Sequence, residues 1–222
     1  MKIEAVVFDM DGLMLDSEKV YVATSQQAAA DLGYTPSEEL AIGVMGSTNE
    51  AWRAAVQGFY GEGFPLADFV VRCDVLMDRW YAQKGIPLKA GLIELLTYLN
   101  SEKIPCAVAS STATQKAMKM LRDGGVEKYF TGFVFGDTIE RSKPAPDIFL
   151  AAAKLLGKEP SHCMGLEDSR NGLHAAKSAG MYTVMRPDLL VPDAELLALV
   201  DGCLPTLLDV IPLIKKLNEK GE

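Results

Sequence analysis

The sequence predicts a doubly wound, Rossmann-like α/β fold: a parallel sheet with helices on both faces, and a helical insert after its first strand. Short apolar runs recur along the chain with helical stretches between them. The region between residues 17 and 84 breaks this rhythm, because it has no β-rich run and contains both tryptophans. We therefore expect a core domain formed by residues 1–16 and 85–222 and a helical domain formed by residues 17–84.

Five short apolar runs are expected to form the strands of the core. Each run is continuous rather than alternating, as in strands that are buried on both faces of a parallel sheet. In chain order they are Ile3–Phe8, Ile104–Ala109, Gly132–Phe135, Cys163–Leu166 and Tyr182–Met185. The repeated order of strand, helix and strand implies right-handed crossover connections.

Three helices of the core are marked by signals at their ends. Pro146–Leu156 begins with a proline, which is favoured in the first helical turn, and is followed by Gly157. Asn171–Ala179 is followed by Gly180, and Thr114–Arg122 is followed by a pair of glycines. Glycine just after the last helical residue is a common stop signal, so the three segments are predicted to be helices.

The helical insert contains a typical helix start in the sequence TPSE. We expect Thr35 to cap this helix, Pro36 to take its first position and Glu38 to reach back to the cap. The tryptophans are expected to pack inside the insert. Its two connections to the core are expected at Leu13–Ser17 and Gly85–Gly91.

Charge and composition exclude several classes of protein. The 222 residues, 49% of them hydrophobic, suffice for a large core, and the net charge of −8 disfavours nucleic-acid binding. No run approaches the roughly 18 apolar residues that cross a membrane, and acidic residues interrupt the N-terminal apolar stretch where a signal peptide would need it. The four cysteines form no CxxC pair and are expected to be reduced, in or near the core. We expect a cytoplasmic protein that is a monomer.

Polar side chains follow four of the expected strands at the point where each strand ends. Ligands of open parallel sheets bind beyond the carboxyl ends of the strands, so these side chains should meet along one edge. Each is an ordinary turn signal by itself, but their joint pattern indicates a site. They are Asp9 and Asp11 after the first strand, Ser110, Ser111 and Thr112 after the second, Asp137, Ser142 and Lys143 after the third, and Glu167, Asp168 and Ser169 after the fourth.

The carboxylates at these strand ends predict a magnesium site. Asp9, Asp168 and Glu167 would repel one another unless a cation lay between them. A few oxygen ligands, with room for water and a phosphate oxygen, suit Mg²⁺ better than Zn²⁺ or a full Ca²⁺ cage. An EF-hand loop that starts at Asp9 is excluded, because its sixth position is Met14 rather than glycine and its twelfth is Val20 rather than glutamate.

The remaining strand-end residues suit the transfer of a phosphoryl group. Lys143 would supply a second positive charge, and the hydroxyl of Ser110 together with a backbone N–H at the following helix start would complete the grip on phosphate. Ser111 is a further candidate for phosphate contact at that helix start. Asp9 would attack phosphorus, since carboxylates are established nucleophiles that form acyl phosphates. Asp11 would protonate the leaving oxygen and later accept a proton from water, which accelerates such reactions by about 10²–10⁴-fold.

These motifs together resemble the four motifs of the haloacid dehalogenase superfamily. The resemblance covers essentially the whole chain, because the insert is similar to the helical cap of that superfamily. The nearest subgroup is that of the β-phosphoglucomutase-like sugar-phosphate phosphatases, and two stretches are also similar to phosphatases of 2-deoxyglucose 6-phosphate and pseudouridine 5′-phosphate. The motifs are FDMDG, the VASS that contains Ser110, the RSKPAPD that contains Lys143, and the GLEDS that contains Glu167 and Asp168.

The resemblance implies a role for each matching residue. Asp9 would be the nucleophile, Asp11 the acid and base, and Ser110 and Lys143 the phosphate binders. The Mg²⁺ ligands would be Asp9, the backbone carbonyl of Asp11 and Asp168, with Glu167 next to the metal.

Departures from the family favour hydrolysis over the mutase reaction. True dehalogenases lack the second aspartate, so Asp11 indicates phosphoryl transfer. The β-phosphoglucomutases carry a cap arginine for a second phosphate where Asn49 stands here, and a histidine where Tyr21 stands. Neutral Asn49 cannot grip a phosphate as an arginine fork would, although Arg53 lies one helical turn further on.

Two further segments are candidates for substrate contact. The loop Met45–Asn49 is expected either to meet the substrate or simply to connect two helices. Asn171 follows Asp168 closely enough to contact it or the phosphate, unless it only caps a helix.

We therefore expect a Mg²⁺-dependent phosphatase that hydrolyses a small phosphorylated metabolite, a sugar phosphate or a nucleoside-like phosphate, through an aspartyl-phosphate. A phosphomutase is the alternative. A non-catalytic metabolite-binding module is disfavoured, because a sensor has no need of both Asp9 and Asp11.

Overall fold

The structure, a computed structural model, describes residues 2–45, 47 and 49–219, apart from the side chain of Asn49. The chain divides into two compact units. The core unit comprises Met1–Leu15 and Leu88–Glu222, and the insert unit comprises Asp16–Pro87.

The core unit contains the predicted parallel sheet. Over the described residues the sheet has six strands in the order β3-β2-β1-β4-β5-β6, all parallel. In the centre of the sheet, Val7 of β1 is paired with Ala107 of β2 on one side and Gly165 of β4 on the other. The strands are β1 Ala5–Phe8, β2 Cys106–Ser110, β3 Gly132–Phe135, β4 Cys163–Glu167, β5 Tyr182–Met185 and β6 Gly202–Cys203.

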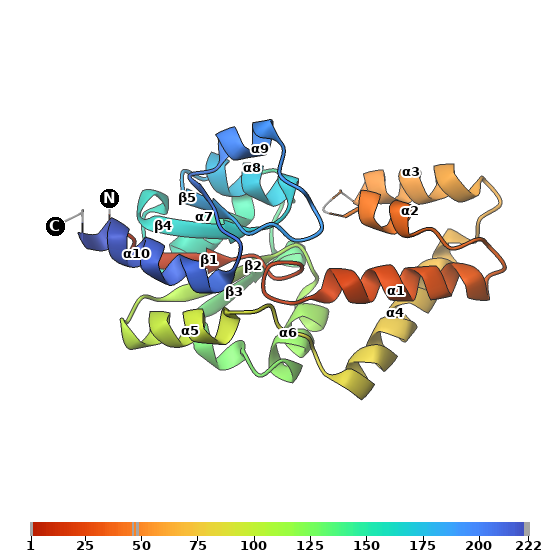
Figure 1. Cartoon of the computed structure of the whole chain (residues 1–222), viewed down its shortest axis with the longest axis horizontal. Helices are drawn as coiled ribbons and strands as arrows, with labels where there is room; N and C mark the ends of the chain where they lie inside the picture. Colours follow the sequence, from red (N-terminus) through yellow and green to blue (C-terminus); the bar gives the residue numbers. More distant parts are fainter. Residues whose placement is uncertain (1, 46, 48, 220–222) are drawn as a thin grey trace. The chain divides into compact units, whose positions relative to one another are not determined.

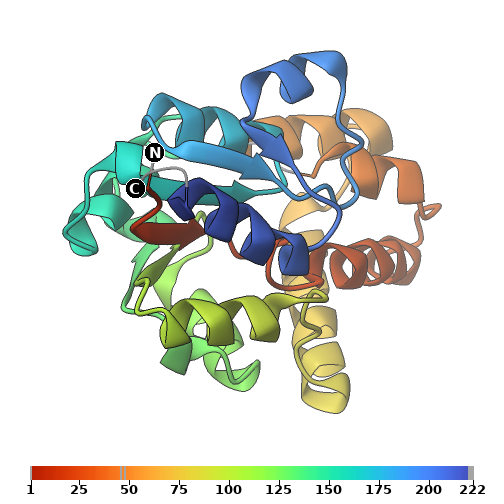
Figure 2. The same cartoon turned by 60° about the vertical axis from the view of Figure 1, so that its left-hand side comes forward.

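Helices cover both faces of this sheet (Figures 1 and 2), which confirms the doubly wound fold. On one face, α7 and α8 share a buried apolar cluster with alternate strand residues such as Ala5 and Val7. The intervening Val6 and Phe8 are also fully buried, because successive side chains of a strand point to opposite faces. The helices of the core are α5 Leu92–Ser101, α6 Thr114–Asp123, α7 Asp147–Leu155, α8 Arg170–Ser178, α9 Ala194–Leu199 and α10 Val210–Glu219, with short 3-10 turns η1 Glu127–Tyr129, η2 Gly136–Thr138, η3 Pro160–His162 and η4 Leu207–Asp209.

The insert unit is helical. Its core is aromatic: Trp52 stacks on Phe69, and Tyr60 stacks on Phe64 with their ring centroids 4.4 Å apart. Trp80 is half-buried and meets Tyr81 edge to face. The helices are α1 Ser17–Asp31, α2 Glu38–Gly43, α3 Asn49–Tyr60 and α4 Leu66–Lys84.

The predicted cap of the second insert helix is wrong by two residues. Ser37, not Thr35, is the N-cap of α2, and its hydroxyl accepts a hydrogen bond from the N–H of Leu40 at 3.0 Å. Both residues have a cap-forming hydroxyl, so the local sequence TPS does not distinguish between them.

The chain leaves and re-enters the core unit at adjacent positions. Leu15 and Leu88 form an antiparallel bridge, and the N–H of Lys89 donates to the carbonyl of Met14 at 2.8 Å. The two connections therefore fix each other within the core.

Within the part of the chain that the structure describes, no helix is both long enough and apolar enough to cross a bilayer. All four cysteines are free thiols; Cys203, on the edge strand β6, is exposed, whereas the other three are buried.

Candidate active site

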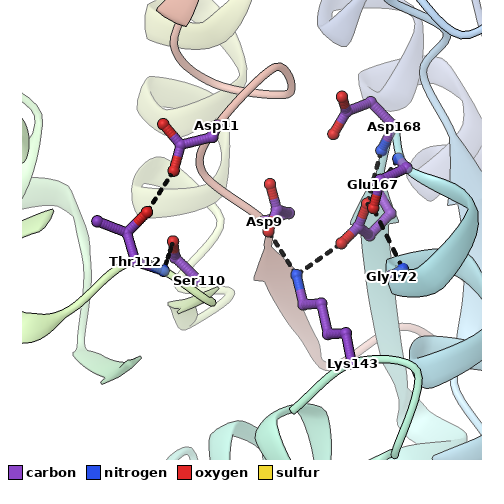
Figure 3. A network of polar contacts seen from close by, with 9 residues as sticks. Asp9, Asp11, Ser110, Thr112, Lys143, Glu167, Asp168 and Gly172 are labelled. Carbon is purple, nitrogen blue, oxygen red and sulfur yellow. Dashed lines mark hydrogen bonds and ion pairs between the residues drawn. The ribbon is translucent and has the colours of Figure 1, made fainter. Parts of the chain in front are cut away.

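The site lies where the strand order of the sheet reverses. β1 lies between β2 and β4: the chain runs outward from β1 through β2 to β3 on one side and continues with β4 on the other side, and such a switch point is the place where open α/β sheets bind ligands. Asp9 directly follows β1, Ser110 ends β2, Glu167 ends β4 and Asp168 follows it. The fold thus brings these predicted residues to the same edge (Figure 3).

Lys143 lies between two carboxylates. Its ammonium group donates to Oδ1 of Asp9 in a short hydrogen bond and to Oε1 of Glu167 at 2.6 Å. The three residues are buried, with Glu167 fully so. Lys143 comes from the loop after η2, so this contact joins the connection after β3 to the ends of β1 and β4 (Figure 3).

Glu167 is held in place on every side. Its Oε2 accepts hydrogen bonds from the N–H of Asp168 at 2.9 Å, the N–H of Ser169 at 2.8 Å and the hydroxyl of Ser169 at 2.9 Å. A Cβ built on Gly172 would lie 1.6 Å from Oε1, so only glycine leaves space for this carboxylate. With Oε1 on Lys143 and Oε2 on the following turn, Glu167 is suited to position Lys143 and the Asp168 turn.

Three carboxylates form a candidate metal centre. Oxygen atoms of Asp9, Glu167 and Asp168 all lie within 4.8 Å of one another, and all three residues are buried. Carboxylate oxygens are the ligands that Mg²⁺ prefers, so this donor set fits that ion. Within the described part of the site, Lys143 forms ion pairs with two of these three buried acids, Asp9 and Glu167, and three carboxyl groups around one ammonium group favour binding of a further cation.

Burial also affects the protonation of the nucleophile candidate. It raises the pKa of Asp9 well above its usual range, the Glu167 charge adds to this, and Lys143 opposes it. A bound divalent cation would favour the ionised carboxylate, which is the nucleophilic form.

Asp11 is held by a residue of the neighbouring strand end. The hydroxyl of Thr112 donates to Oδ2 of Asp11 at 2.8 Å, and Figure 3 shows this pair on the side of Asp9 away from Glu167. Asp11 is half-buried. A carboxyl group beside the nucleophile, held by a neutral hydroxyl, is suited to exchange protons with a bound substrate.

The two serines after β2 differ in their environments. Ser110 is 1% exposed, and its Oγ accepts a hydrogen bond from the N–H of Thr112 at 3.1 Å. Ser111 is exposed. Its carbonyl oxygen would lie only 2.3 Å from a Cβ added to Gly136. Ser110 therefore belongs to the buried site, whereas the backbone of Ser111 packs against the end of β3.

Two further residues, Asn171 and Asn49, stay predicted substrate contacts. Asn171 is the second residue of α8 and is half-buried; the cap of that helix is Ser169, whose Oγ accepts from the N–H of Gly172 at 3.2 Å. Asn49 begins α3, but its side chain and residues 46 and 48 of the same loop lie outside the described part of the chain.

Sequence reasoning gave no separate role to Thr112, Ser169 or Gly172, which hold the acidic side chains. The only sign of their role in the sequence is that each lies next to one of the motifs. Nothing in the sequence indicates which carboxylate each residue contacts. Asp137, in contrast, has a structural role. Its carboxylate accepts from the N–H and hydroxyl of Thr114 at the start of α6, which lowers its pKa.

Comparisons with known proteins agree with this geometry. The family model of the haloacid dehalogenase-like hydrolases matches residues 6–186. The phosphorylated carbohydrates phosphatase of Thermotoga maritima is 32% identical over 181 residues, which cover 82% of this chain and 83% of that protein. A Drosophila melanogaster protein provisionally named a pseudouridine-5′-phosphatase is 35% identical over 205 residues, covering 84% of this chain and 83% of that protein.

A solved structure has the same fold. A Thermotoga maritima protein provisionally named a β-phosphoglucomutase superposes with a TM-score of 0.81 at 29% identity, over 96% of this chain and 99% of that chain.

Proposed function

The chain belongs to the haloacid dehalogenase-like hydrolase family, and on that premise we propose that it hydrolyses a small phosphomonoester through an aspartyl-phosphate at Asp9, with Mg²⁺ as cofactor. The observation that carries this proposal is the contact of one buried lysine, Lys143, with Asp9 and Glu167 beside Asp168. A nucleophile, a fixed cation and a set of oxygen ligands for a metal lie together there.

Asp9 is the proposed nucleophile. Its carboxylate oxygen forms a bond to phosphorus while the bond from phosphorus to the leaving alcohol oxygen breaks, and Asp11 gives that oxygen its proton. A water molecule then attacks phosphorus and passes its proton to Asp11, the bond between phosphorus and Asp9 breaks, and both aspartates are regenerated.

Lys143 and Ser110 are proposed to bind the phosphoryl group. The ammonium group is held by two carboxylates and needs little reorganisation when negative charge develops on the phosphoryl oxygens. Asp9, the carbonyl of Asp11 and Asp168 would hold Mg²⁺, and Glu167 would position Lys143 and the Asp168 turn. The ion, when bound, supplies positive charge that stabilises the transferring phosphoryl group.

The substrate is proposed to be a sugar phosphate or a nucleoside-like phosphate. Two similar proteins support this range, since their names state phosphorylated carbohydrates and pseudouridine 5′-phosphate. We propose that the insert unit selects among such substrates and that Asn49 and Asn171 contribute to this choice.

Phosphate release is the test of this function. We would incubate the protein with a panel of sugar and nucleoside monophosphates in Mg²⁺, in EDTA, and in EDTA followed by excess Mg²⁺. Release that stops in EDTA and returns with Mg²⁺ is the expected result. Release that is equal under all three conditions would contradict the role of the metal.

A phosphomutase is the second candidate, favoured by the likeness to a protein provisionally named a β-phosphoglucomutase. The same experiment separates the two reactions. A sugar 1-phosphate is supplied together with a sugar bisphosphate as primer. If it is converted to the 6-phosphate faster than phosphate is released, the protein is a mutase rather than a phosphatase. Specific binding of a phosphate ester without either reaction would indicate a metabolite-binding module.

A further inference from the structure

A buried ion cluster at the carboxyl end of β5 takes no part in the chemistry proposed above. Oδ1 of Asp188 accepts hydrogen bonds from Nζ of Lys89 at 2.6 Å and from Nη1 of Arg186 at 3.0 Å. The side chains of Lys89 and Asp188 are 4% and 6% exposed, and that of Arg186 is 17% exposed. Charges buried to this degree are costly to desolvate, so such a cluster is weak evidence for a stabilising role.

The polar atoms of the cluster are incompletely satisfied. Oδ2 of Asp188 and Nε of Arg186 are buried and have no hydrogen-bond partner within the described part of the chain. Buried polar groups of this kind oppose folding. The cluster is therefore better explained by what it holds in position than by stability.

Arg186 connects the cluster to the loop that carries Asp11. Its Nη1 also donates at 3.4 Å to the carbonyl of Gly12, the residue that follows Asp11. The backbone N–H of Arg186 donates to the carbonyl of Glu167 at 2.8 Å, so the arginine is itself anchored to the end of β4. One residue thus links the loop after β1, through its side chain, to the strand that carries the Glu167–Asp168 turn, through its backbone.

Lys89 connects the cluster to the chain where it returns from the insert. The backbone N–H of Lys89 donates to the carbonyl of Met14 at 2.8 Å, and the preceding Leu88 is bridged to Leu15. Asp188 therefore joins two supports of the same loop, one at Gly12 and one at Met14.

The supported loop is a tight turn. Gly12 has a φ of +81°, a conformation that favours glycine, and its N–H donates to the carbonyl of Leu15 at 3.0 Å. The N–H groups of Met14 and Leu15 both donate to the carbonyl of Met10 at 3.0 Å. A shift of this turn moves Asp11, because Asp11 lies inside it.

We propose that Lys89, Arg186 and Asp188 are positioning residues, which hold the Met10–Leu15 turn so that Asp11 lies where the leaving oxygen needs its proton. This inference rests on the proposed function for the role of Asp11. The cluster does not touch the reacting atoms and acts only through the backbone of the turn.

Hydrogen–deuterium exchange tests the positional part of this proposal without any substrate. In Asp188→Asn, the peptide that contains Met10–Leu15 should exchange faster than in the unaltered protein. The matched control is Asp201→Asn, which makes the same change in an ion pair with Lys177 remote from the turn and should leave that peptide unchanged. Unchanged exchange of the Met10–Leu15 peptide in folded Asp188→Asn would overturn the proposal.

Steady-state kinetics test the catalytic part. Misplacement of a catalytic group by about 1 Å can lower the rate on the order of 10²-fold, so Asp188→Asn should reduce kcat by that order while KM changes little. Asp201→Asn should retain full kcat. A rise in KM with kcat unchanged, or an equal loss of kcat in both variants, would contradict a positioning role.

The two hypotheses can fail separately. If the unaltered protein releases no phosphate, the proposed function fails, and the exchange experiment still decides whether the cluster holds the turn. If Asp188→Asn does not fold, Lys89→Met replaces it in both experiments, because this variant leaves Arg186 paired with Asp188. The same faster exchange is expected, and its absence would overturn the proposal.

Discussion

At the residue scale, the candidate site depends on a buried ammonium group that two acids share. Burial by itself lowers the pKa of Lys143, but the charges of Asp9 and Glu167 outweigh it and raise that pKa above its ordinary value. The two acidic charges therefore favour the ammonium form of the side chain. A fixed charge of this kind stabilises a phosphoryl group without rearranging when the group is transferred.

The contact between Thr112 and Asp11 leads to a prediction for a single hydroxyl. Thr112→Val keeps the shape of the side chain and removes its hydrogen bond to Oδ2 of Asp11. Loss of this hydrogen bond should lower kcat on the order of 10-fold, with a smaller effect on KM. Steady-state phosphate release measures both constants.

Thr112→Ser is the control for that substitution. It keeps the hydroxyl and should retain most of the activity. If Thr112→Val is as active as the unaltered protein, Thr112 does not position Asp11 for catalysis.

At the scale of elements, the turn from β4 into α8 places the acidic side chains. Ser169 caps α8 through its Oγ, and the same hydroxyl donates to Glu167. The first turn of the helix then passes directly beside the Glu167 carboxylate at Gly172. The helix start and the site are therefore one packed structure.

Gly172→Ala tests this packing. The added methyl group would overlap Glu167, which cannot move without breaking its bonds to Lys143 and Ser169. Overpacking of this kind should lower the free energy of unfolding by about 1–3 kcal/mol, and displacement of Glu167 should also reduce kcat. Denaturant unfolding and phosphate release measure the two effects.

Gly58→Ala provides the matched control. Gly58 lies within α3, and nothing stands within 4 Å of the position of the added Cβ. Alanine there should raise stability by about 0.5–1 kcal/mol, because it lowers the entropy of the unfolded chain. Equal stability losses in the two variants would show that the space beside Glu167 is not the cause.

The strands could be predicted from the sequence because burial on both faces leaves a continuous apolar run. The expected range Tyr182–Met185 agrees with β5, and Gly132–Phe135 agrees with β3. The two residues of β6, Gly202–Cys203, are too few to form such a run. Whether so short a segment pairs at the edge of the sheet depends on the neighbouring strand β5 rather than on the sequence of the segment itself.

The supports of the site could not be predicted in the same way. The ion pair of Lys89 with Asp188 joins positions 99 residues apart, and its geometry is set by how β5 and the returning chain pack. Motifs indicated which carboxylates gather at the sheet edge. The contacts that orient them, such as Thr112 with Asp11, depend on tertiary structure.

At the scale of the whole molecule, the three buried acids predict that stability depends on Mg²⁺. Bound Mg²⁺ stabilises the folded chain by mass action, by about 2.7 kcal/mol when its concentration is 100 times Kd. The melting temperature should therefore rise with Mg²⁺, whereas a sodium salt of equal ionic strength should have a smaller effect. In Asp168→Asn, which removes one proposed ligand charge, the rise due to Mg²⁺ should be much reduced. An equal rise in both proteins would place the ion elsewhere.

The core unit and the insert unit are proposed to have different roles, catalysis and selection of the substrate. The described catalytic candidates belong to the core unit, which forms the sheet and its carboxyl edge. The role of the insert unit in selecting the substrate stays a prediction, which the substrate panel tests when it is repeated on Asn49→Ala. A changed order of preference with unchanged Mg²⁺ dependence is the expected result.

The most direct test of the central claim is to trap the phosphoryl group on Asp9. Asp11→Asn should still accept a phosphoryl group from an activated donor such as acetyl phosphate in Mg²⁺, but should hydrolyse it slowly because no carboxylate accepts the proton of water. Mass spectrometry of the acid-quenched protein should then find one added phosphoryl group in the peptide that contains Asp9, and none in the Asp9→Asn, Asp11→Asn double variant. A phosphoryl group on another residue, or its retention in the double variant, would contradict the account.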